Sequence, residues 1–279
     1  MNGRFTFLAT LLIIIALSHS VACAFDPIGP PAARLKGGWS ATTLEYLYSS
    51  MDLEADGFAF SFASGRITFP SDTIENIKSN KVYANLASGL QDNGEVFLRL
   101  GAMDASPDTG DNQGNWAGFV GDSDYEFAVG AGAKFNFGQS QDGAHIWSLV
   151  AQTSYASLDL DIKTSTILKV PVTPKPTATL TAEVDIWEVQ IALGYTRRFG
   201  DRFRVYCGPF LHFVSGDADI KGSIDGVATK ASTDLEQDSD IGGYVGAEWS
   251  RGGDFSFCVE WQFTSGGYAL GAGLIWRFE

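Results

Sequence analysis

Histidine and serine are the residues of this sequence best suited to catalysis, because an imidazole beside a hydroxyl can remove its proton and create a nucleophile. Beyond residue 24 the only histidines are His145 and His212, and each has a serine three positions later, Ser148 and Ser215. In an extended strand, residues three apart point to opposite faces. We therefore expect both histidines to be ordinary wall residues, and we predict no catalytic residue and no enzymatic activity.

Acidic residues could instead bind a metal ion. The run from Asp217 through Asp219 to Gly222 has part of the spacing of a calcium loop. However, its fifth position is Lys221, and its twelfth is Ala228 where a bidentate Glu is required. The loop does not qualify, so we predict no metal site and no cofactor.

The elements that position these residues are strands. From Tyr125 to Phe137 every odd position is apolar or aromatic, whereas the even positions, which include Glu126 and Lys134, hold no large apolar residue. A period of two over such a length is typical of a strand with one apolar face. Similar alternation predicts ten strands, at residues 39–50, 80–88, 95–104, 125–137, 145–160, 181–198, 203–216, 240–250, 254–264 and 267–278.

The connections between these strands alternate in length. Short turns are expected at 91–94, 138–143, 199–202 and 251–254; longer loops are expected at 51–79, 105–124 and 217–236, with a Pro-rich loop around 171–176. Only the connection near 265–266 departs from this order. Such sorting is typical of membrane barrels, so we predict an all-β, antiparallel, up-and-down transmembrane β-barrel of about ten strands, with eight to twelve allowed. A secreted β-sandwich is the rival fold.

Charged residues share the polar face of the predicted strands. An isolated buried charge is costly, so we expect these residues to form ion pairs inside a narrow lumen, which at about ten strands is close to being filled by side chains. The predicted charge network consists of Glu45, Arg99, Glu126, Lys134, Glu188, Glu248, Glu260 and Arg277.

The same alternation places the two cysteines that follow the N-terminal region. Cys258 alternates with apolar neighbours and should face the lumen, whereas Cys207 shares the apolar face of its strand and should face lipid. A third strand separates their two strands, which puts them about 9–10 Å apart, beyond the reach of a disulfide. We expect two free thiols.

The composition and the N-terminal residues further limit the class of protein and its location. The 279 residues include 32 Gly and 13% aromatic residues, and the formal net charge is −14. These values argue against disorder, against a helical bundle and against nucleic acid as a partner. Residues 1–24 read as a signal peptide, with an apolar core at 5–17 and a small-residue cleavage site at Ala22-Cys23-Ala24; a lipidated Cys23 is the alternative. Residues 25–36 then form a periplasmic N-terminal segment, and residues 37–279 form the barrel domain.

The last predicted strand carries a family resemblance. Gly273, Trp276 and Phe278 follow the pattern of Gly, two residues, aromatic, any residue, Phe. This resembles the C-terminal strand of Gram-negative outer-membrane β-barrel proteins of the small OmpA/opacity/porin-like type, although the chain ends in Glu279 instead of Phe. The resemblance implies a location in the cell outer membrane and recognition of the terminal strand by the barrel-assembly machinery.

These observations predict a structural or surface-exposed barrel with a plugged or narrow lumen. A narrow, weakly cation-preferring porin and a barrel enzyme acting on envelope lipids or peptides are alternatives. The expected partners are outer-membrane lipid, lipopolysaccharide and the assembly machinery, and the partner of the external loops is unknown. Acidic stretches at 104–124 and 234–240 are candidates for Ca²⁺ or Mg²⁺ that bridges to lipopolysaccharide.

Overall fold

The computed structural model describes residues 25–57, 59–62, 65–68, 72–91, 93–107, 120–163, 178–224, 226–237, 241–251 and 254–279. The predicted signal peptide lies outside these residues. Within them the strands are β1 (Ser40–Ala55), β2 (Ala59–Phe62), β3 (Gly65–Thr68), β4 (Asp72–Leu90), β5 (Gly94–Pro107), β6 (Val120–Asp122), β7 (Glu126–Gln139), β8 (His145–Lys163), β9 (Ala178–Phe199), β10 (Phe203–Ile224), β11 (Val227–Gln237), β12 (Ile241–Ser250), β13 (Phe255–Thr264) and β14 (Gly267–Phe278). Across the same residues, no helix has the length and apolar character needed to cross a membrane.

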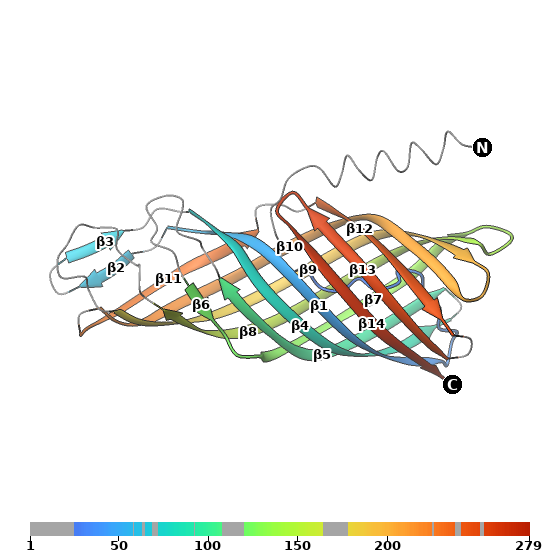
Figure 1. Cartoon of the computed structure of the whole chain (residues 1–279), viewed down its shortest axis with the longest axis horizontal. Helices are drawn as coiled ribbons and strands as arrows, with labels where there is room; N and C mark the ends of the chain where they lie inside the picture. Colours follow the sequence, from blue (N-terminus) through green and yellow to red (C-terminus); the bar gives the residue numbers. More distant parts are fainter. Residues whose placement is uncertain are drawn as a thin grey trace.

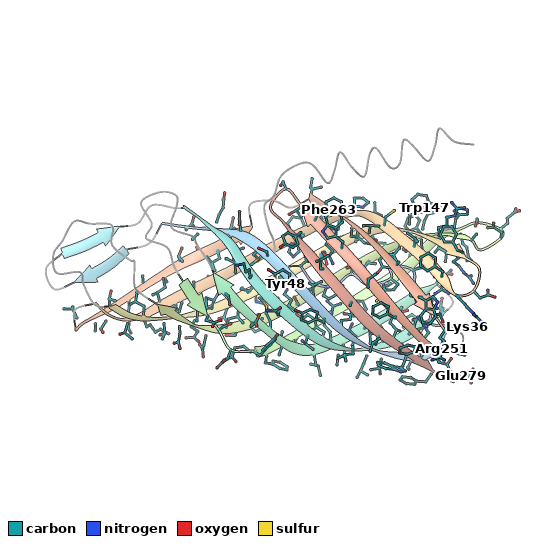
Figure 2. All side chains as sticks on the ribbon, in the orientation of Figure 1. Lys36, Tyr48, Trp147, Arg251, Phe263 and Glu279 are labelled. Carbon is teal, nitrogen blue, oxygen red and sulfur yellow. The ribbon has the colours of Figure 1, made fainter. Side chains whose placement is uncertain are left out.

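Ten of these strands close into a ring, and the predicted fold class is confirmed (Figure 1). The hydrogen-bonded order is β1–β14–β13–β12–β10–β9–β8–β7–β5–β4, and β4 pairs back onto β1. Every pairing is antiparallel. The turns after β4, β7, β9 and β12 are short and lie at one end of the ring, called here the short-turn end. Lys36, Arg251 and Glu279 all lie toward that end (Figure 2).

Large apolar side chains cover the outer face of the ring. Leu98, Phe127 and Leu193 are each at least half exposed. Their neighbours on the same face include Leu86, Phe135, Trp147, Trp187, Trp249, Leu270 and Trp276. A soluble barrel would bury such residues, so this face is the lipid-facing surface of a membrane barrel.

Toward the end opposite the short turns, the two faces of the wall exchange their polarity. Along β9, the outward face from Trp187 to Phe199 is mostly apolar, and the inward face carries Glu188 and Gln190. Before Trp187 the outward residues are Thr179, Thr181, Glu183 and Asp185, and the inward residues are Leu180, Ala182, Val184 and Ile186. Because an apolar interior and a polar exterior suit water, the wall leaves the membrane near Trp187.

The polarity exchange corrects the prediction of a loop at 217–236. Here β10 continues to Ile224 and turns back as β11, which pairs with β10 and then with Leu53–Ala55 of β1. The wall thus extends beyond the shorter strands β12, β13 and β14 (Figure 1). We call this extension the outer tower; it comprises Leu53–Ala55, Ala156–Asp161, Leu180–Ile186, Val214–Lys221 and β11. The predicted loops 51–79 and 105–124 likewise contain β2, β3 and β6.

Residues 25–36 were predicted to be a periplasmic segment, and the structure places most of them inside the ring instead. Phe25, Ile28 and Leu35 are almost fully buried. Three prolines in this stretch lack the backbone N–H that a strand ladder needs, so the segment runs through the lumen without joining the wall. We call residues 25–36 the plug.

Candidate functional site

The first residues of the plug are held by two ring contacts of Phe25 and by the apolar burial of Ile28. The ring centroid of Phe25 lies 5.4 Å from that of Phe210 and 5.2 Å from that of His212, both on β10. Ile28 is buried within the same apolar cluster, which continues into the outer tower. These contacts position the beginning of the plug at the level where the polarity of the wall changes.

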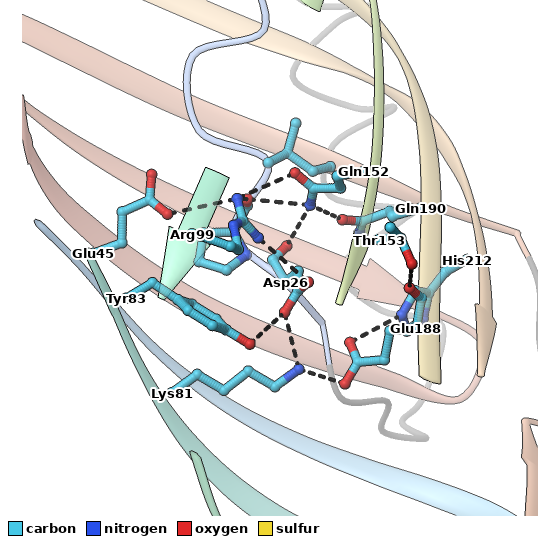
Figure 3. A network of polar contacts seen from close by, with 12 residues as sticks. Asp26, Glu45, Lys81, Tyr83, Arg99, Gln152, Thr153, Glu188, Gln190 and His212 are labelled. Carbon is cyan, nitrogen blue, oxygen red and sulfur yellow. Dashed lines mark hydrogen bonds and ion pairs between the residues drawn. The ribbon is translucent and has the colours of Figure 1, made fainter. Parts of the chain in front are cut away.

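Asp26 is the centre of a buried ion network (Figure 3). Its Oδ1 lies 3.1 Å from Nζ of Lys81, and its Oδ2 lies 3.3 Å from Nη1 of Arg99. The hydroxyl of Tyr83 donates to Oδ1 at 3.3 Å. Lys81 and Tyr83 point inward from β4, and Arg99 from β5. The plug therefore supplies the carboxylate that these two buried cations need.

The two cations also bind carboxylates of the wall. Lys81 Nζ donates to Glu188 Oε1 at 2.5 Å, and Arg99 Nη2 lies 3.8 Å from Glu45 Oε2. Glu188 Oε2 lies 3.5 Å from Nε2 of His212. Since isolated buried charges are strongly unfavourable, the network is stable only while both the plug and the wall contribute.

A row of three glutamines satisfies the backbone of the plug. Gln152 donates to Gln190 Oε1 at 2.6 Å, and Gln190 donates to Gln262 Oε1 at 3.0 Å. Gln262 then donates to the carbonyl of Asp26 at 2.8 Å. Glu260 accepts the backbone N–H of Ile28 at 3.0 Å. Backbone groups that would be buried without partners are thereby paired.

Toward the short-turn end, a second polar cluster holds the rest of the plug. Lys134 donates to the carbonyl of Pro30 at 2.9 Å, and Asn136 exchanges hydrogen bonds with the backbone of Ala33 at 2.7 and 2.9 Å. The guanidinium of Arg34 binds Glu248. The plug is thus tied to the wall along its whole length.

Most of the predicted charge network lines the lumen around the plug. Seven of its residues bind the plug or one of its partners: Glu45, Arg99, Lys134, Glu188, Glu248, Glu260 and Arg277. Glu126 faces inward, but among the described residues it makes no hydrogen bond or ion pair. Sequence reasoning missed Asp26 and Lys81. The alternation that placed Val82 outward would have placed Lys81 inward, but nothing comparable indicated Asp26.

The other predicted residues lie as follows. Cys207 is exposed, Cys258 is buried, and both are free, as predicted. In β14, Trp276 and Phe278 face outward. A Cβ at Gly273 would lie 3.0 Å from Sγ of Cys258, so a larger residue would crowd the lumen there. Recognition of this strand by the assembly machinery stays a prediction.

The described side-chain contacts of the two histidine rings are with Tyr195 for His145 and with Glu188 and aromatic rings for His212. His145 Nδ1 lies 2.6 Å from the hydroxyl of Tyr195, and neither ring nitrogen of His212 has a hydrogen-bond partner. Within the described residues, no group of three or more His, Cys, Asp or Glu side chains could hold a metal ion. The predicted acidic stretches at 104–124 and 234–240 lie partly outside these residues.

Comparisons with known proteins identify the fold. No protein-family model matches the chain, and no curated protein matches it. The structure is similar to that of the outer membrane protease OmpT from Escherichia coli, with a TM-score of 0.51 and 11% identity over 88% of this chain and 99% of that chain. The outer membrane protein OprG from Pseudomonas aeruginosa gives a TM-score of 0.42 and 11% identity, over 88% of this chain and 98% of that chain. The toluene transporter TbuX from Ralstonia pickettii gives a TM-score of 0.39 and 9% identity, over 90% of this chain and 92% of that chain. The chain has the fold of Gram-negative outer-membrane β-barrel proteins, as the resemblance implied.

Proposed function

We propose that this protein is a plugged, non-conducting barrel of the outer membrane, whose role is to anchor and present its outer tower at the cell surface. The observation that carries the proposal is the plug, in which residues 25–35 occupy the lumen and bind its wall through buried ion pairs. In this arrangement the short-turn end faces the periplasm and the outer tower faces the exterior.

The lumen is closed by two successive layers. The lower layer is polar and consists of the plug with its charged and amide partners. The upper layer is apolar, because Leu53, Leu158, Val184 and Leu235 lie in the buried cluster of the outer tower. An ion that passed the first layer would have to lose its hydration in the second, which is costly. A polar layer followed by an apolar layer favours a closed lumen over the open lumen of a narrow porin.

The outer tower presents an acidic surface to its surroundings. Asp217 on β10 lies directly opposite both Asp185 on β9 and Asp234 on β11. Like charges in such pairs repel each other, so this face is stable only when it is well solvated. The tower therefore suits exposure to water above the lipid-facing belt, and we propose lipopolysaccharide as the neighbour of the belt itself.

Single-channel recording in planar lipid bilayers tests the proposed closure. Protein shown to be folded by heat-modifiable gel mobility should insert without steady conductance steps. A steady conductance of the wild type that decreases in Glu188→Gln would instead show an open, cation-preferring pore and would overturn the proposal.

The absence of catalysis is also part of the proposal. The protease named in the comparison shares only 11% identity with this chain, and the two histidine rings described above contact no serine or cysteine side chain. Purified protein should not hydrolyse peptides or phospholipids. Turnover by the wild type that is lost in folded His145→Ala or His212→Ala would contradict this view.

A further inference from the structure

Arginines converge on one carboxylate where the lumen opens at the short-turn end. Glu248 on β12 is only 1% exposed. Its Oε1 accepts from Nη2 of Arg277 at 2.9 Å and also binds Arg34, and its Oε2 accepts from Nη1 of Arg204 at 3.1 Å. These three arginines come from the plug, from β10 and from β14, so three separate segments meet here.

The positive charge of this cluster exceeds its negative charge by two. Three guanidinium groups carry +3, and Glu248 carries −1. Two nearby pairs of opposite charge leave this difference unchanged, and the acidic side chains closest to Arg277 along the sheet and the chain, those of Asp254 and Glu279, are exposed to solvent at the rim. Arg198 lies opposite Arg204 on the adjacent strand and has Asp201 at 3.9 Å. Glu95 accepts the backbone N–H of Arg34 at 3.3 Å, but it lies opposite Lys134 in the sheet.

The guanidinium groups still have donors to offer. Each of the three arginines binds Glu248 through a single nitrogen, and the same Nη2 of Arg277 also donates to Ser256 Oγ at 3.0 Å. A guanidinium has five N–H donors arranged to bind an oxyanion through two of them. The side chains of Arg34, Arg204 and Arg277 are 19%, 14% and 10% exposed. They are thus largely removed from water and yet reachable from the mouth of the lumen.

We infer that this cluster, the arginine mouth, binds a small soluble oxyanion of the phosphate class. A phosphate group carries up to two negative charges and three or more acceptor oxygens, which matches the excess charge and the unused donors. Because Arg34 belongs to the plug and Arg204 and Arg277 belong to the wall, the bound anion joins the plug to the barrel. This inference depends on the position of the plug, but not on closure of the lumen to ions.

Thermal unfolding in detergent tests the inference, with inorganic phosphate as the probe. The wild type is titrated with phosphate against chloride at constant pH and ionic strength, and its midpoint temperature should rise with phosphate and then saturate. In Arg277→Gln and Arg204→Gln the apparent affinity for phosphate should fall by about tenfold or more, since each loses a charge-assisted hydrogen bond. Glu248 keeps two arginines in each variant, so both should fold.

Arg251→Gln is the matched control, because Arg251 is an exposed arginine of the adjacent short turn. Its response to phosphate should equal that of the wild type. The inference is wrong if phosphate does not stabilise the wild type beyond chloride, or if all three variants respond as the wild type does. Single-channel recording remains a separate measurement, so an open lumen and an absent anion site are distinguishable results.

Discussion

Replacing Lys81 with Met should destabilise the barrel more than almost any other single substitution of a charged residue. Lys81 is fully buried and binds Asp26 of the plug at 3.1 Å as well as Glu188 of β9. In Lys81→Met, Asp26 keeps Arg99 and the hydroxyl of Tyr83. Glu188 keeps only His212, at 3.5 Å. One carboxylate is thus left nearly unpaired in the interior.

The magnitude follows from that missing partner. Removing one member of a buried ion pair costs about 3–5 kcal/mol, because the remaining charge is buried without compensation. Lys221→Met is the matched control, since Lys221 pairs with Glu183 at 3.0 Å on the outer tower, where both side chains are about half exposed. An exposed pair of this kind contributes about 0–1 kcal/mol. The two lysine variants should therefore differ by about 2 kcal/mol or more.

Guanidinium unfolding in lipid or detergent, followed by tryptophan fluorescence, measures this difference. The unfolding free energy must fall with guanidinium concentration at the same slope in all variants, so that a change in the denaturation midpoint reports a change in stability. If Lys81→Met is too unstable to fold, Glu188→Gln in the wild-type background removes one charge of the network with little change in shape and should still cost about 1–3 kcal/mol. Losses in Lys81→Met and Glu188→Gln no greater than that in Lys221→Met would refute the assigned ion network.

Three further predictions concern the wall. Leu193→Arg should cost about 2–4 kcal/mol because Leu193 faces lipid, whereas Thr181→Arg on the same strand but in the outer tower should change the unfolding free energy by less than about 1 kcal/mol; equal losses would contradict the assigned membrane boundary. Gly246→Ala should lower the unfolding free energy by about 1–3 kcal/mol, because a Cβ there would lie 2.3 Å from the ring of Tyr206, and an unchanged denaturation midpoint would count against this packing. Cys207 is a free thiol that faces lipid, where the reactive thiolate does not form readily, so in proteoliposomes a charged maleimide should label it only after unfolding in denaturant; rapid labelling of the folded protein would place this thiol in water.

The strands themselves could be predicted because their signal is local. The alternation at 125–137 predicts β7, which runs from Glu126 to Gln139. The predicted segment at 267–278 coincides with β14. From Phe127 to Phe137 in β7, and along all of β14, the outward side chains are apolar because these stretches cross lipid. A single pattern therefore describes each of them completely.

The outer tower could not be predicted in the same way, because β8, β9 and β10 each cross two environments. In β10, Phe213 faces outward to lipid, whereas Ile220 faces inward to the apolar core of the tower. Within one strand, therefore, the apolar face shifts from the odd-numbered positions, which point outward, to the even-numbered positions, which point inward. A search for a single apolar face ends the strand near residue 216 and assigns the remainder to a loop. An apolar face that shifts between odd and even positions at an aromatic residue is the signal that would have indicated the tower.

The plug was the hardest feature to predict, because its partners are distant in the sequence and its own residues show no periodicity. Asp26 is 55 residues from Lys81 in the sequence, and Arg34 is 214 residues from Glu248. Lys81 and Arg99 place two cations at one level of the lumen, and the carboxylate between them comes from neither strand. Because Glu188 and Glu45 of the wall also bind these two cations, charge counting along the strands does not reveal Asp26, and only the three-dimensional path of the plug shows it.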